Sequence, residues 1–404
     1  MIYEGMRGEQ SPWKPYLDIL PTDYNTLMFW TQDELDQLQA SAVIQKIGKD
    51  SANSLFTEKV LTPIRANPAL FPNSVSLGDD HLLYLAHHMA STIMAYAFDI
   101  EKEPSAQDMD EDGFALEEED DLLPKGMVPL ADMLNADGDR NNARLFYGGT
   151  TVTMRALRPI KAGEEIFNDY GPLPRTDLLR RYGYITPAYT QYDVVEIPRQ
   201  LVIDVFRAKA PDCDPTTPYD EIVSLHCTKE DLAEDLVTEK VCVIPCLALI
   251  NIPRPTTDIH FKLDYLDEYD ALEDGYDVFR NPEDDLFPDS LRIMLWTMDL
   301  TAIDMLSRKG SKPRRAALDP QEKDSVRFLA ILCDILRARL DQYPTSLQED
   351  EQLAQALEQS PPQNNSDLRK TMAVHVRIGE KQIRMDALIR ASNAHADAMR
   401  NHIN

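Results

Sequence analysis

The spacing of apolar residues divides the chain into a helical first part, a short β-rich region and a long helical second part. Residues 81–99 predict an amphipathic helix, since one set of side chains recurs at helical spacing: Leu82, Leu85, Met89, Thr92, Ile93 and Tyr96. His87 and His88 lie on or beside that face, and we interpret them as packing or surface residues, with a ligand role as the alternative. Upstream, Thr31 and Glu34 have the spacing of a capping box, which predicts a helix start at Thr31.

The pattern changes between residues 127 and 170. Residues 143–147 and 151–156 are two strand-like runs separated by a pair of glycines, which predicts a hairpin. A third strand is predicted over residues 165–168, after a turn, and a helix over residues 175–182. This region is therefore predicted to be a compact β unit with helical insertions.

From about residue 196 onward the patterns are helical. Residues 291–305 form a Met-rich stripe, which we interpret as core, and residues 326–340 form a second stripe. Ser346 and Glu349 predict a helix start with a capping box, and a last helical pattern runs from residue 368 to about 395.

Composition limits the class of protein. The 404 residues suggest two or three domains, and 43% hydrophobic content is typical of a globular protein. The longest apolar run, residues 241–252, contains Pro245 and is shorter than the roughly 20 residues of a membrane span, so no membrane partner is expected. The five cysteines are too scattered for a disulfide framework, and Cys242 and Cys246 lack a second pair at metal-ligand spacing. We therefore expect no metal and a location in the nucleus or cytoplasm.

The charge favours a basic partner. A net charge of −28 argues against direct contact with nucleic acid, whose phosphates need Lys and Arg. It suits a basic protein, although solubility alone is an alternative explanation. Residues 101–121 hold eleven acidic residues and one Lys, which predicts a disordered acidic loop over about residues 101–126.

The residue types that carry chemistry lie in residues 127–184. Three motifs follow one another here. Asn135-Ala136 follows an apolar run, Asn168-Asp-Tyr170-Gly follows a Gly-Glu-Glu turn, and Tyr182-Gly-Tyr184 ends a short helix. This succession resembles the C-terminal half of a SET-domain lysine methyltransferase. Ser11-Pro-Trp-Lys-Pro-Tyr16 looks like the start of the helical insert of the Rubisco large-subunit methyltransferase type, and residues 343–350 and 377–383 resemble its C-terminal substrate-binding domain.

The resemblance implies an α+β fold. Residues 1–195 would form a partial SET β-fold with a helical insert (about 11–100), and residues 196–404 an all-α substrate-binding domain. The Asn135-Ala136-Asp137 variant is most similar to the fungal ribosomal lysine methyltransferases. The implied reaction is N-methylation of a lysine in a basic protein, a ribosomal one by this resemblance, with S-adenosyl-L-methionine as cofactor.

The same resemblance implies roles for single residues. Tyr170 would be catalytic, with a tyrosine that merely packs at a strand end as the alternative. Asn135 would bind the cofactor through its amide and Ala136 through its backbone, although Asn135 could instead be a turn residue. Tyr96 would touch the cofactor and Tyr182 both cofactor and lysine channel. The substrate lysine would also meet two residues: Asp132 and Tyr184.

One family motif is not found. Relatives carry a turn reading roughly Arg-Gly-x-Gly ahead of the helical insert, and Gly5-Met-Arg-Gly8 is a poor match that we interpret as a loop. We therefore expect that the first SET strands are missing, either because the chain is truncated or because it is a degenerate, non-catalytic binding protein. A helical scaffold unrelated to methylation is a third hypothesis. The sequence leaves the target lysine, the number of methyl groups and the oligomeric state open.

Overall fold

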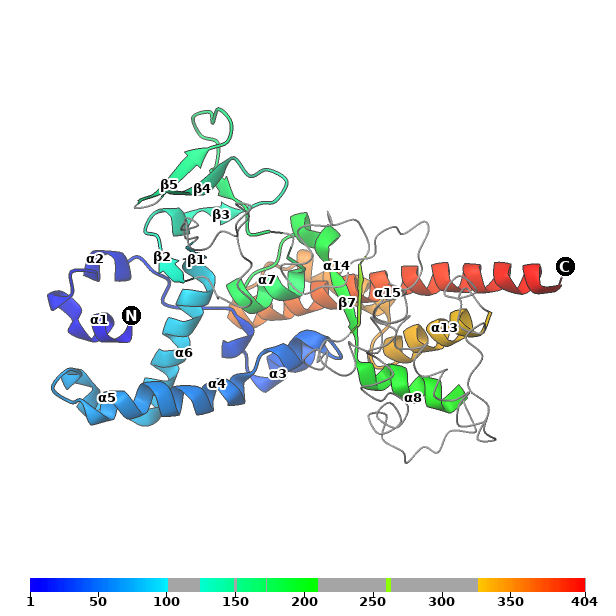
Figure 1. Cartoon of the computed structure of the whole chain (residues 1–404), viewed down its shortest axis with the longest axis horizontal. Coiled ribbons are helices and arrows are strands. Elements are labelled where there is room, and N and C mark those ends of the chain that lie inside the picture. The colour runs from blue at the N-terminus through cyan, green and yellow to red at the C-terminus, as the bar shows by residue number, and fades with distance from the viewer. Residues whose placement is uncertain (101–123, 149–150, 172, 210–258, 263–325, 404) are drawn as a thin grey trace, which may run out of the picture. The chain divides into compact units, whose positions relative to one another are not determined.

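The computed structural model describes residues 1–100, 124–148, 151–171, 173–209, 259–262 and 326–403 (Figure 1). The chain divides into two compact units. The first contains Met1–Leu38, Val43–Thr190 and Pro362–Ala373, and the second contains Gln39–Ala42, Gln191–Pro361 and Val374–Asn404. The domain boundary expected at residues 195 and 196 stays a prediction. Three predicted features lie outside the described residues: the acidic segment 101–123, the Cys242 and Cys246 pair, and the Met-rich stripe 291–305.

Helices dominate the start of the first unit. They are α1 (Ile2–Arg7), α2 (Lys14–Leu17), α3 (Gln32–Leu35), α4 (Lys49–Phe56), α5 (Thr62–Ala66) and α6 (Asp79–Tyr96), with α7 (Arg175–Tyr182) further along the chain. The capping box predicted at α3 is confirmed: Thr31 Oγ1 accepts from the Glu34 backbone N–H, and the Glu34 carboxylate accepts from that of Thr31. Leu61, Ile64 and Leu82 form a buried core cluster among these helices.

The helix predicted over residues 81–99 is wrong at its C-terminal end. Helix α6 ends at Tyr96, and Ala97 has extended backbone angles (φ −83°, ψ 145°). Residues Ala97–Asp99 form β1, which pairs antiparallel with β2 (Lys125–Met127). Lys125 and Gly126, the last residues of the predicted acidic loop, therefore belong to a strand, because their backbone pairs with that of β1.

The buried face of α6 includes polar side chains that the sequence placed on or beside it. His87 and Thr92 are buried and each has a hydrogen-bond partner, although the Nδ1 of His87 has none among the described residues. The His87 ring nitrogen Nε2 lies 2.6 Å from Asn53 Oδ1, and Thr92 Oγ1 accepts from the Tyr24 hydroxyl at 2.8 Å. His87 is thus a packing residue, as interpreted from the sequence.

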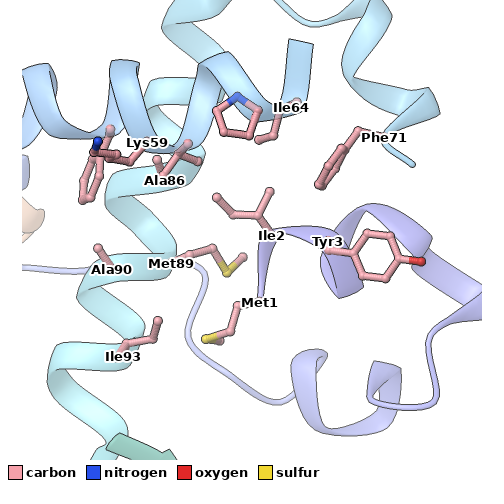
Figure 2. Close-up of a pocket in the computed structure, with 13 residues that line it drawn as sticks. Met1, Ile2, Tyr3, Lys59, Ile64, Phe71, Ala86, Met89, Ala90 and Ile93 are labelled. Atoms are coloured by element: carbon pink, nitrogen blue, oxygen red, sulfur yellow. The ribbon is translucent and has the colours of Figure 1, made fainter. Parts of the chain in front are cut away.

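Part of the predicted apolar face of α6 lines a cavity instead of the core. This cavity, of about 380 Å³, is lined by residues of α1, α5 and α6. Figure 2 shows Ile2 and Met89 facing its centre, with Ile93 further along the same helix. The Tyr3 ring packs edge-on against Phe71, with ring centroids 5.7 Å apart. Helical spacing predicted that Ile93 is buried. It remains 39% exposed, because it lines this cavity.

The β part of the first unit consists of short pairs. The hairpin predicted from residues 143–156 is confirmed, since β4 (Ala143–Gly148) pairs antiparallel with β5 (Thr151–Ala156). β3 (Asn135–Ala136) pairs parallel with β6 (Phe167–Asn168). Figure 1 shows β3 beside this hairpin. The parallel pair thus places residues 135–136 next to residues 167–168, although the two segments are distant in sequence.

The fully buried side chain of Asn142 connects these strands. Its amide Nδ2 donates to the Glu165 carbonyl at 2.8 Å, and its Oδ1 accepts from the Phe167 backbone N–H at 2.9 Å. This explains why the strand predicted over residues 165–168 is shortened to β6, since a side chain takes the place of a strand partner.

The second unit is mainly helical, with α8 (Arg199–Lys209), α13 (Val326–Leu340), α14 (Leu347–Glu358) and most of α15 (Asn365–Ile403). The capping box predicted at Ser346 is confirmed. The second unit also contains strands, because β7 (Val194–Ile197) pairs antiparallel with β8 (Ile259–Lys262). The β7 side chains are all buried, and Arg339 Nε donates to the Glu196 carbonyl at 2.9 Å. Among the described helices, none combines the length and apolar character needed to cross a membrane.

Buried charges hold α14 and α15 together. Asp350 of α14 accepts from Arg377 Nη2 at 2.7 Å and from Lys381 Nζ at 2.5 Å. All three side chains are at most 2% exposed. Nearby, Glu380 accepts from the hydroxyls of Tyr343 and Ser41 at 2.5 and 2.7 Å. Such charges are stable in the interior only as complete networks.

Candidate functional site

The predicted site residues converge on one cavity of about 280 Å³ in the first unit. Its lining includes all seven of them: Tyr96, Asp132, Asn135, Ala136, Tyr170, Tyr182 and Tyr184. They come from the end of α6, the turn before β3, β3 itself, the segment after β6 and the end of α7. The structure thus brings them together, and their roles stay predictions.

Tyr170 follows β6 and points its hydroxyl at the backbone. The hydroxyl donates to the Leu134 carbonyl at 3.0 Å. The Tyr170 ring stacks on that of Tyr182, with centroids 4.6 Å apart and planes 22° from parallel. Burial raises the pKa of the Tyr170 phenol, and neighbouring Tyr184 adds to the shift. At neutral pH this phenol is therefore a hydrogen-bond donor and not a base.

Tyr182 and Tyr184 reach the same cavity because the chain reverses between them. Gly183 ends α7 in the left-handed region (φ 77°), and its N–H donates to the carbonyls of Leu178 and Leu179. The Tyr184 ring then lies 6.4 Å from that of Tyr182, centroid to centroid. Burial raises the pKa of Tyr184 as well.

Asn135 and Ala136 form one side of the cavity. Both belong to β3, so the pairing with β6 fixes their backbone. The Asn135 side chain is exposed, and its Nδ2 donates to Glu165 Oε1 at 2.7 Å. The carboxamide predicted to bind a cofactor thus lies at the rim of the cavity and is oriented by a carboxylate.

Asp132 is the one carboxylate among the described residues that line the cavity. Its side chain is 5% exposed. Oδ2 accepts a short hydrogen bond from the Tyr16 hydroxyl. Oδ1 is buried and has no hydrogen-bond partner among the residues that the structure describes. Such an oxygen is a strong acceptor, which suits a positively charged ligand.

Tyr96 lies on the cavity wall at the last residue of α6. Burial raises the pKa of its phenol, and the nearby charge of Asp132 raises it further. Tyr96 thus joins Tyr170 and Tyr184 as a protonated phenol at neutral pH.

Tyr16 lines the cavity but received no role from the sequence. It belongs to the motif Ser11-Pro-Trp-Lys-Pro-Tyr16, which only marked the start of the helical insert. Its partner Asp132 is 116 positions away, and no spacing rule connects residues at that distance. The hydroxyl of Tyr16, next to two prolines and a tryptophan, was the available signal.

Two family models match the chain. The SET domain matches residues 9–171, and the Rubisco LSMT substrate-binding domain matches residues 260–383. Ribosomal lysine N-methyltransferase 4 of Saccharomyces cerevisiae is 36% identical over 204 residues, which are 49% of this chain and 40% of the yeast protein. N-lysine methyltransferase SETD6 of Homo sapiens is 34% identical over 190 residues, which are 45% of this chain and 36% of the human protein. The matched part is thus less than half of either relative.

Solved structures share the fold. The SET domain of LSMT bound to lysine and AdoHcy aligns with a TM-score of 0.55 and 16% identity, covering 98% of this chain and 74% of that chain. Rubisco LSMT bound to AdoMet gives a TM-score of 0.53 and 15% identity over the same shares. The predicted fold class is confirmed by these matches. The chain is therefore similar to SET-domain proteins over residues 9–171 and to the Rubisco LSMT substrate-binding domain over residues 260–383.

Proposed function

We propose that this chain acts in S-adenosyl-L-methionine-dependent N-methylation of protein lysine, and that its substrate is a basic protein of the large ribosomal subunit. The observation that carries the proposal is the cavity in which a phenol, a carboxamide and a buried carboxylate meet. The names of the yeast and human relatives support the reaction class, and that of the yeast relative supports a ribosomal substrate. We further propose a nuclear or cytoplasmic location, based on the scattered cysteines.

The residues of the cavity fit the reacting end of this cofactor. When bound, the cofactor supplies a methyl group carried on a positively charged sulfur. The aromatic rings of Tyr170 and Tyr182 suit a positive charge beside them. Asn135 through its amide and Ala136 through its backbone would hold the rest of the molecule.

The cavity residues would act mainly by positioning the lysine. The Tyr170 hydroxyl already has a fixed direction, because it donates a hydrogen bond to the Leu134 carbonyl. It can therefore orient an amine nitrogen with its lone pairs without giving up that hydrogen bond. The tyrosine rings keep water from an amine held there, which disfavours its ammonium form and works against the attraction of the Asp132 carboxylate.

Replacing Tyr170 tests the proposal. Tyr170→Phe keeps the ring stack and removes one oriented hydroxyl, so we expect methyl transfer to fall by about 100-fold or more. The measurement is incorporation of label from S-adenosyl-L-methionine into isolated ribosomal subunits. The fold should be retained, as judged by the thermal unfolding midpoint.

Tyr147→Phe is the matched control. The Tyr147 hydroxyl also donates to a backbone carbonyl, that of Asp99 at 2.5 Å, but Tyr147 is not part of the cavity lining. We expect its methyl transfer to stay within about twofold. Equal activities of Tyr170→Phe and wild type would contradict the role of Tyr170. No transfer by the wild type to ribosomal subunits or other basic proteins would favour a non-catalytic binding protein.

A further inference from the structure

We infer that Tyr16 is a positioning residue, which holds Oδ2 of Asp132 so that Oδ1 remains available to accept a hydrogen bond from an alkylammonium group in the cavity. The inference rests on the proposed function in one respect: a protonated lysine side chain is the natural alkylammonium ligand. The pairing of the two residues is independent of it, since Tyr16 and Asp132 both line the cavity and are joined by a short hydrogen bond.

The chemistry of the partner explains why a tyrosine suits this position. An Arg or Lys beside Asp132 would neutralise the carboxylate and compete with a cationic ligand. A phenol donates one hydrogen bond and leaves the negative charge in place. Burial raises the pKa of Tyr16, and its hydrogen bond to Asp132 raises it further, so the phenol stays a donor.

The free oxygen of Asp132 is the second observation. Leaving a buried carboxylate oxygen without a partner costs free energy, and native proteins rarely do so without a reason. Asp132 is 5% exposed, and its Oδ1 has no partner in the described part of the chain. A ligand that donates to this oxygen would remove that cost, which is how a built cation site behaves.

The backbone next to Asp132 is strained in a way that fits a fixed orientation. Leu130 has φ 77° and ψ −37°, which a residue with a side chain rarely adopts. The turn that follows contains Asp132, whose N–H donates to the Val128 carbonyl at 3.1 Å. Strain of this kind persists only where the surroundings determine the conformation. Together with Tyr16, this turn holds Asp132 from two sides.

The test compares a charged and a neutral probe of the same shape in the whole chain. We propose to titrate n-butylammonium and n-butanol and to follow the cavity tyrosines by NMR of ¹³C-labelled tyrosine rings. The wild type is expected to prefer n-butylammonium. In Tyr16→Phe that preference should fall by about tenfold, since a hydrogen bond that orients a charged group is lost. The affinity for n-butanol should stay within about twofold.

Tyr24→Phe is the matched control, because it also removes a tyrosine hydroxyl of the first unit that bonds a side chain, the Thr92 hydroxyl at 2.8 Å. Its preference should equal that of the wild type. Asp132→Asn is the second variant, since the amide oxygen can still accept from Tyr16 while the charge is gone. We expect this variant to lose the preference completely.

The inference is overturned by an unchanged preference in Tyr16→Phe, by equal losses for both probes, or by a preference that survives in Asp132→Asn. These outcomes are separate from the fate of the proposed function. Methyl transfer without any charge preference would leave the function standing and remove the role of Tyr16. A charge preference that depends on Tyr16, found without methyl transfer, would support the role of Tyr16 and contradict the proposed function.

Discussion

Gly183 shows how one residue without a side chain shapes the site. It lies in the left-handed region, and a Cβ at this position would lie 2.7 Å from the Thr26 backbone nitrogen and 2.8 Å from the Asn25 carbonyl carbon. Both neighbours are backbone atoms, which cannot turn away as a side chain could. The close approach lets the chain reverse between Tyr182 and Tyr184, and both rings thereby reach the cavity.

We predict that Gly183→Ala lowers the free energy of unfolding by about 3 kcal/mol, from left-handed strain and overpacking together. Gly163→Ala is the control, because Gly163 has a similar φ of 83° but no atom within 4 Å of the added Cβ. It should lose only about 1 kcal/mol. Urea titration of both variants measures the difference. Equal losses would show that the contact with residues 25 and 26 has no energetic effect.

At the scale of elements, the contact between α14 and α15 depends on one aspartate. Asp350 balances two buried cations, Arg377 and Lys381. Burial alone would raise the pKa of Asp350, but the hydrogen bonds from Arg377, Lys381 and Thr345 outweigh it and lower the pKa below its ordinary value. The carboxylate is therefore charged throughout the neutral range.

The lowered pKa predicts an acid-dependent loss of stability. The contribution of Asp350 is fully present above its unfolded pKa of about 4 and is lost as the pH falls through the lower folded pKa. Asp350→Asn leaves two cations uncompensated, so we expect a loss of about 3–5 kcal/mol at pH 7. Its unfolding free energy should also depend less on pH below about 4 than that of the wild type.

The exposed Asp341 provides the control for this measurement. Asp341→Asn should change the free energy of unfolding by no more than about 0.5 kcal/mol at any pH between 3 and 7. Denaturant titrations of both variants across this range supply the data. A wild-type curve that ran parallel to that of Asp350→Asn would exclude the ion pairs as the source of acid sensitivity.

Local signals in the sequence predicted the elements that depend on local chemistry. The capping boxes at Thr31 and Ser346 and the helix α7 follow from neighbouring residues, and the sequence placed them correctly. The pairing of β3 with β6 and the shortening of β6 by Asn142 depend on contacts more than twenty residues apart. No periodicity records such contacts.

The candidate site was predictable to the extent that motifs carry it. Asn135, Tyr170 and Tyr182 stand in motifs that resemble a known family, and they line one cavity. The bond between Tyr16 and Asp132 and the orientation of Asn135 by Glu165 were not predictable, since each needs the fold to bring two segments together.

At the scale of the whole molecule, the net charge of −28 acts on every approaching partner. Opposite charge accelerates association and like charge slows it, and salt screens both effects. The proposed substrate is a basic protein, so the field would favour the encounter before any specific contact forms.

We predict that binding of a basic protein substrate slows as ionic strength rises. Between about 0.05 and 0.5 M salt the association rate constant should fall by about tenfold or more, with a smaller change in the dissociation rate. Stopped-flow fluorescence with a labelled substrate measures both. The same substrate with its non-target lysines acetylated is the control and should show a weaker dependence. A rate that is independent of salt would mean that the charge has no part in recognition.

The raised pKa values of Tyr16, Tyr170 and Tyr184 have a consequence for proton traffic. None of these phenols is ionised near pH 7, so none of them can take up the proton that an ammonium must release before it reacts. That proton has to pass to another group, either the carboxylate of Asp132 or solvent at the mouth of the cavity. In either case the proton exchanges with solvent, so a deuterated solvent should slow the step in which the amine is freed.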